Sequence, residues 1–132
     1  MKLLRVGELG KEIPAVIDSE NKIRDLSKIV QDFNPDYINF DILDKIKKID
    51  LKSLPHIENN QRIGSCVTKP LNFLAIGLNY KAHAEETNSD APTEPIVFNK
   101  SPNSIIGPND KIIIPKYSNS LDHEVEIAII IG

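Results

Sequence analysis

The chain has 132 residues, 40% hydrophobic and 27% charged, which is the size and composition of one globular domain or of a small domain plus part of another. A net charge of −3, an aromatic content of 5% and the absence of Trp exclude the basic surface and stacking platform of a nucleic-acid-binding protein. No run of about 18 apolar residues is present, so we expect no membrane span. The single Cys66 suits a reducing compartment, and we expect a cytoplasmic protein.

The first part of the chain predicts a small β-meander followed by helices. Short apolar runs at 3–6, 13–17 and 22–26 are separated by polar or glycine-containing turns and predict three strands. Ser27 is expected to cap a short helix through about Phe33, and Asp41 a second helix with apolar residues at 42, 43, 46 and 49. Residues 50–70 are polar and predict a linker with a short strand near 63–67. We therefore place a small N-terminal domain and linker at 1–69.

Residues 70–132 predict the first part of a β-rich domain. Apolar runs at 72–77, 96–98 and 112–114 predict strands, with another at 104–106 and a closing strand that begins near His123. Residues 80–87 predict one or two helical turns, and 107–110 a tight turn. Since so many apolar strands need a second layer to cover them, we expect this to be the N-terminal portion of a longer protein. A complete small protein with a C-terminal edge strand is the alternative. The predicted fold class is α+β, β-rich.

Two carboxylates, Glu124 and Glu126, stand one residue apart at the head of the last apolar run. Side chains alternate across a strand, so both would lie on one face, with Cα atoms roughly 6.6 Å apart. Two buried like charges repel each other and call for a cation, and a hard divalent metal ion is the natural candidate. A surface strand with two solvated glutamates is the alternative.

A second candidate is the pair His83 and Glu86, which follows the strand predicted at 72–77. On a helix these positions are i and i+3, so the side chains are neighbours on one face. A carboxylate beside an imidazole can fix its tautomer, and such a pair can take a proton from water. An exposed helix with an incidental ion pair would show the same spacing.

Several spaced motifs, taken together and in order, resemble the fumarylacetoacetate hydrolase family from about Phe73 to Gly132. The motifs are Gly77-Leu78-Asn79-Tyr80-x-x-His83-x-x-Glu86, Glu94-Pro95-Ile96-Val97-Phe98-x-Lys100, Ile106-Gly107-Pro108-x-Asp110 and Asp122-x-Glu124-x-Glu126-x-Ala128-x-x-Ile131-Gly132. Segments 1–5, 22–27 and 62–64 also look like the small leading domain of bacterial members. Among these the chain is most similar to enzymes assigned to 2,4-diketo-3-deoxy-sugar-acid hydrolysis, often labelled ureidoglycolate lyase.

The resemblance implies a mixed β-sandwich roll and a metal-dependent enzyme that cleaves a carbon–carbon bond in a 2,4-dioxo acid, such as an acylpyruvate. Carried over by position, His83 and Glu86 match the water-activating dyad, Tyr80 and Lys100 lie by the substrate, and Glu124 and Glu126 bind Mg²⁺ or Mn²⁺. The family's third metal carboxylate lies on a later strand and has no counterpart in these residues. We therefore expect a C-terminally truncated chain that is inactive alone, and a homodimer at full length.

Three other functions stay open at this point. A lyase or hydratase on the same scaffold, acting on ureidoglycolate or a 2-oxo-4-enoic acid, would share the metal site. A non-catalytic fragment that lacks the third metal ligand is an alternative of another class. A metal-binding barrel of the cupin type would need several histidines on strands, and the chain has only His56, His83 and His123.

Overall fold

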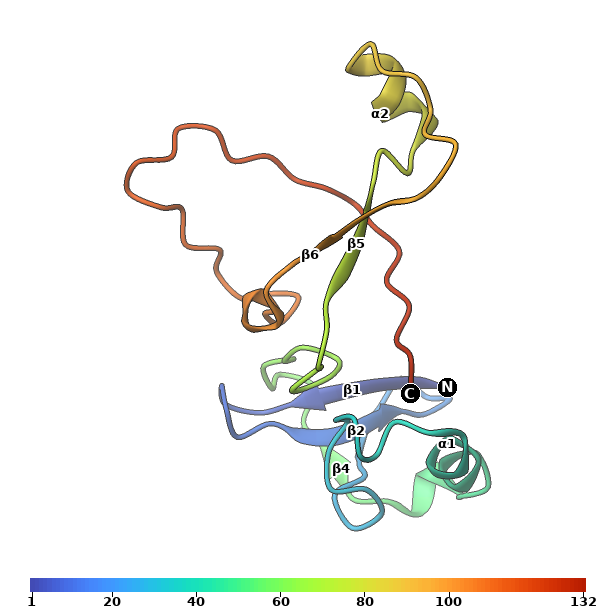
Figure 1. The fold of residues 1–132 in the computed structure, drawn as a ribbon. Helices are drawn as coiled ribbons and strands as arrows, with labels where there is room; N and C mark the ends of the chain where they lie inside the picture. The colour runs from blue at the N-terminus through green and yellow to red at the C-terminus, as the bar shows by residue number, and fades with distance from the viewer. The chain divides into compact units, whose positions relative to one another are not determined.

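The computed structural model describes all 132 residues, which form two compact units (Figure 1). The first unit combines Met1–Thr68 with Ile106–Gly132, and the second is Lys69–Ile105. The strands pair antiparallel and the helices are few and short, which confirms the predicted α+β, β-rich class. None of the helices has the length and apolar character needed to cross a bilayer. The division at 69 into a leading domain and a catalytic domain stays a prediction.

An antiparallel sheet of four strands, in the order β1-β2-β3-β4, is the centre of the first unit. Its strands are β1 (Lys2–Val6), β2 (Ile13–Ile17), β3 (Ile23–Asp25) and β4 (His56–Ile57). The first three match the predicted meander, and their alternating side chains feed two apolar clusters. The strand predicted near 63–67 is wrong, because only Ile63 pairs, in an isolated bridge to Val6.

The helix α1 (Phe40–Lys47) supplies the other side of one apolar cluster. Ile46 is fully buried there, together with Val16, Leu26, Val30 and Phe33. The predicted N-cap, Asp41, is wrong by two positions. Asn39 caps the helix instead, since its side-chain oxygen accepts a hydrogen bond from the Ile42 amide at 3.0 Å. A short 3₁₀ turn, η1 (Leu51–Ser53), follows.

The helix predicted from Ser27 to Phe33 is wrong, because only one turn forms. The amides of Ile29 and Val30 both bond to the Leu26 carbonyl, and the structure then leaves helical geometry. Asp25, rather than Ser27, starts this turn by accepting a hydrogen bond from the Ser27 amide at 2.7 Å. Two apolar residues of this segment, Val30 and Phe33, enter the core from an irregular loop.

A buried ion pair fixes the turn between β2 and β3. The side chain of Asp18 is 1% exposed and accepts hydrogen bonds from the amides of Lys22 and Glu20 and from Nε of Arg24. The Lys22 amide first, and then the Arg24 guanidinium and the Glu20 amide, outweigh burial and lower the pKa of Asp18 to about 2. Asp18 is therefore a carboxylate that the fold needs in its charged form.

The second unit is a two-stranded ribbon with a short helix between its strands. Strand β5 (Leu74–Gly77) pairs antiparallel with β6 (Ile96–Asn99), and α2 (Lys81–Glu86) lies between them in sequence. These elements confirm the strands and helical turns predicted there. The strand predicted at 104–106 is wrong, because a 3₁₀ turn, η2 (Pro102–Ser104), occupies that place.

The last segment of the chain has no regular secondary structure, so the strands predicted at 112–114 and from His123 onward are wrong. Figure 1 draws this segment, which belongs to the first unit, as an irregular line. A strand needs a neighbour for its backbone hydrogen-bond ladder, and neither sheet includes these residues. Their apolar side chains are consequently exposed, with Ile127 and Ile131 each at 86%.

Candidate functional site

The turn from β5 into α2 positions the first candidate site. Leu78, in that turn, has a φ of 50°, in the left-handed region that residues with a Cβ avoid. Such strain of the backbone often lies at functional sites. Residue type does not predict a positive φ at Leu78, since the neighbouring Gly77 and Asn79 are the residue types that favour such a conformation.

Helix α2 presents His83 and Glu86 to the outside of the second unit. Ala84 is its one buried residue, which turns the opposite face outward. Nδ1 of His83 lies 3.9 Å from Oε2 of Glu86, and the side chains are 53% and 81% exposed. The helix therefore makes the two residues neighbours, as the i, i+3 spacing predicts. The distance is longer than a hydrogen bond, so the carboxylate faces the imidazole without locking it.

Tyr80 and Lys100 belong to the same unit. Tyr80 is the N-cap residue of α2, and its carbonyl accepts hydrogen bonds from the amides of His83 and Ala84. Lys100 follows β6, where its amide donates to the Phe73 carbonyl at 2.7 Å. Its Nζ lies 5.9 Å from the centre of the Phe98 ring, within reach of a cation–π interaction. The ribbon thus brings a tyrosine, a histidine, a carboxylate and a lysine into one compact unit.

Glu124 and Glu126 belong to the first unit, on the exposed segment without regular structure. Carboxylates are suitable ligands for Mg²⁺ or Mn²⁺, but a Mg²⁺ ion demands a nearly ideal octahedron of oxygens. No group of three or more His, Cys, Asp or Glu side chains in the 132 residues is placed to hold a metal ion. The residues present therefore do not make a complete metal site by themselves, and the metal role of both glutamates stays a prediction.

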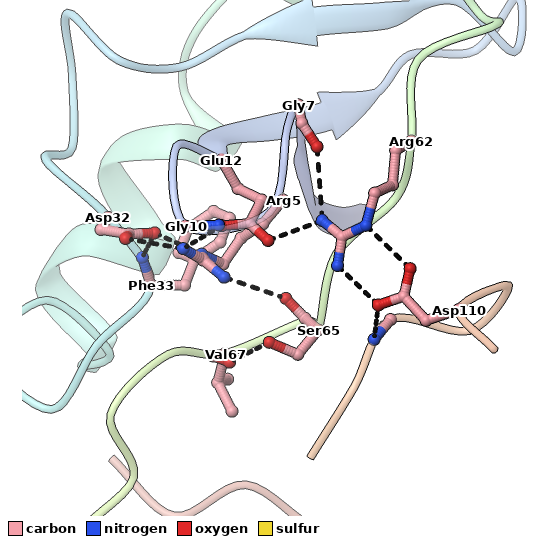
Figure 2. A network of polar contacts seen from close by, with 11 residues as sticks. Arg5, Gly7, Gly10, Glu12, Asp32, Phe33, Arg62, Ser65, Val67 and Asp110 are labelled. Carbon is pink, nitrogen blue, oxygen red and sulfur yellow. Dashed lines mark hydrogen bonds and ion pairs between the residues drawn. The ribbon is translucent and has the colours of Figure 1, made fainter. Parts of the chain in front are cut away.

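A third polar group is centred on Arg62, and the sequence does not predict its contacts. Arg62 forms a forked ion pair with Asp110, and its Nη1 also donates to Glu12 at 2.6 Å (Figure 2). Arg62 and Asp110 are 48 residues apart in sequence, so no local spacing connects them.

Two comparisons with known proteins give concordant results. Residues 72–132 match the family model described as "Fumarylacetoacetate (FAA) hydrolase C-terminal". Over all 132 residues the chain is 46% identical to a protein of Burkholderia ambifaria and to one of Burkholderia lata, and 45% identical to one of Burkholderia multivorans. Each of these relatives is named a "Putative hydrolase".

The matches support the family resemblance carried by the motifs, without its finer assignment to one substrate. All of this chain is aligned, but it covers 47% of each of these relatives, so it spans about half of their length. The matched range includes all six candidate residues, from Tyr80 to Glu126. Residues 72–132 are therefore similar to the FAA hydrolase family, and the whole chain is similar to about half of each Burkholderia protein.

Proposed function

We propose that this chain supplies the water-activating residues of a hydrolase of the FAA hydrolase family. The observation that carries the proposal is the pair His83 and Glu86, displayed outward on α2 beyond a strained turn, within the segment that matches the family model. The substrate class that we propose is a 2,4-dioxo acid, either an acylpyruvate or a diketo-deoxy-sugar acid. The names of the relatives support hydrolysis in general and leave the substrate to experiment.

His83 acts as the general base in this proposal. Its Nδ1 faces Glu86, which leaves Nε2 to accept a proton from a water molecule. The hydroxide adds to the carbonyl carbon distal to the carboxylate of the substrate. The carbon–carbon bond then breaks, its electron pair forms an enolate on the pyruvate side, and the imidazolium returns the proton to that carbon. Glu86, whose Oε2 lies 3.9 Å from Nδ1 of His83, is proposed to orient the imidazole.

Lys100 and Tyr80 are proposed to bind the substrate. The ammonium group of Lys100, next to the Phe98 ring, suits a carboxylate of the substrate as a point-charge partner. Tyr80 is 46% exposed at the start of α2, so its hydroxyl can donate to a substrate oxygen. Both residues lie in the same compact unit as the proposed base.

We further propose that Glu124 and Glu126 provide two of the oxygen ligands of a Mg²⁺ or Mn²⁺ ion. The support is the hard-oxygen chemistry of the pair and its place in the matched segment. Since these residues do not complete a site, no catalytic step is assigned to the metal. Calorimetric titration of the full-length form with Mn²⁺ should show binding that E124Q and E126Q each weaken. Unchanged affinity in both variants would contradict the ligand assignment.

A product assay on a small panel tests the reaction class. The full-length form should release pyruvate and a carboxylic acid from an acylpyruvate. Ureidoglycolate cleavage or hydration of a 2-oxo-4-enoic acid, without acylpyruvate hydrolysis, would replace the proposed reaction by a lyase or hydratase. No turnover on any member of the panel would favour a non-catalytic role.

A further inference from the structure

Five charged side chains of the first unit form a chain of alternating sign (Figure 2). Arg5 on β1 pairs with Asp32, with Nε 2.6 Å from Oδ1, and its Nη2 lies 3.5 Å from Glu12. Glu12 also forms an ion pair with Arg62, with Oε1 2.6 Å from Nη1, and Arg62 in turn pairs with Asp110. The Glu12 side chain is only 6% exposed. Each charge therefore has at least one opposite charge as a neighbour, which offsets the cost of burial.

Arg62 stands on a segment that is attached to the edge of the sheet. The Gly7 amide donates to the Arg62 carbonyl at 2.9 Å, and the Gly64 amide donates to the Arg5 carbonyl at 2.8 Å. Between them Ile63 bridges to Val6 on β1. The guanidinium is consequently held on a backbone that the sheet itself fixes.

Asp110 closes the turn 107–110 and binds Arg62 with the same carboxylate. Its Oδ2 accepts from the Gly107 amide at 2.8 Å and from Nη2 of Arg62 at 2.6 Å, and its Oδ1 accepts from Nε at 2.8 Å. The Arg62 hydrogen bonds first, and then the Gly107 amide, hold the pKa of Asp110 below its usual range. Gly107 itself lies so close to the Ile63 carbonyl and to Gly64 that a Cβ there would collide with backbone atoms.

We propose that Arg62 and Asp110 form a latch that fixes the 107–110 turn on the edge of the N-terminal sheet. The geometry favours a specific contact over an incidental surface pair. The pair is forked, its side chains are 26% and 22% exposed, and a glycine permits the close backbone approach. The latch anchors the beginning of the segment that carries Glu124 and Glu126. It goes beyond the proposed catalysis and does not depend on it.

Hydrogen exchange followed by mass spectrometry on the full-length form tests the latch with D110N and R62K. Asparagine keeps an oxygen for the Gly107 amide but loses the charge and the fork, and lysine cannot span both Glu12 and Asp110. Both variants should exchange the hydrogen-bonded amides of Gly107 and Asp110 on the order of 10-fold faster, since hydrogen bonds to charged groups are stronger than those between neutral groups. Protection at Ile46 in the core should remain as in the wild type.

The matched control is D44N, which removes an exposed ion pair of Asp44 with Lys47 at 2.8 Å. D44N should leave the exchange of residues 106–110 unchanged. Exchange within twofold of the wild type in both D110N and R62K would overturn the latch. Equal acceleration across the whole first unit would also overturn it, because the pair would then support the fold globally rather than hold one turn.

Discussion

Replacing Ile46 by alanine tests whether α1 is docked on the sheet as the structure shows. Ile46 is fully buried, and the substitution removes three carbon atoms from the cluster it shares with Val16, Leu26 and Phe33. At about 0.8 kcal/mol per buried methylene, the transfer contribution alone is about 2.4 kcal/mol. The remaining cavity should raise the loss in unfolding free energy to about 3–4 kcal/mol, within the ~2–5 kcal/mol measured for such truncations. The better helix propensity of alanine offsets less than about 0.7 kcal/mol.

Urea unfolding followed by far-UV circular dichroism measures this loss. The matched control is Phe40→Ala on the same helix, where the side chain is 82% exposed and the expected change is within about 0.5 kcal/mol. If Ile46→Ala costs no more than Phe40→Ala, helix α1 does not pack on the sheet and Ile46 is not a core residue.

Three further predictions concern charge, capping and exposed apolar surface. The pKa of Asp18 is lowered from its ordinary value of 3.8 to about 2 in the folded protein. The stabilisation from its charge is therefore fully present above pH 3.8 and is lost as the pH falls through about 2. The free energies of unfolding of the wild type and Asp18→Asn should accordingly converge on acid titration. Asn39→Ala removes the acceptor for the Ile42 amide and should cost about 1 kcal/mol in a urea melt; no loss would contradict the assigned cap. The double substitution Ile127→Ser and Ile129→Ser should reduce self-association of the 132-residue chain, as measured by light scattering. An unchanged mass distribution would show that these exposed side chains do not drive self-association.

The strands and the short helix of the second unit could be predicted because local pattern and long-range pairing agree there. The same holds for β1 to β3, whose turns carry the expected glycine and polar residues. The helix predicted at 27–33 rested on Ser27 as its cap, whereas Asp25 accepts the capping hydrogen bond and Val30 and Phe33 are core residues of a loop. The strands predicted at 112–114 and after His123 rested on apolar content alone. They are absent because neither segment has a neighbouring strand with which to form a hydrogen-bond ladder.

In the candidate site, too, the sequence predicts local geometry but not the contacts between distant segments. The i, i+3 geometry of His83 and Glu86 is a local property of a helix, so the sequence was sufficient to predict it. The common face of Glu124 and Glu126 was deduced from a strand, and that argument fails because their segment has no regular secondary structure, whereas their role as metal ligands stays a prediction. Local spacing predicts neither the positive φ of Leu78 nor the pairing of Arg62 with Asp110. The first is a property of the turn backbone, and the second depends on how two segments distant in sequence meet.

The most direct test of the account is the turnover of an acylpyruvate by the full-length form with His83→Ala. Loss of a general base should lower kcat by ~10²–10⁴-fold with little change in KM. The control is His56→Ala, which alters a histidine on β4 outside the proposed site and should retain the wild-type kcat. A wild-type kcat in His83→Ala would contradict the assignment of His83 as the base, and with it the central claim about this chain.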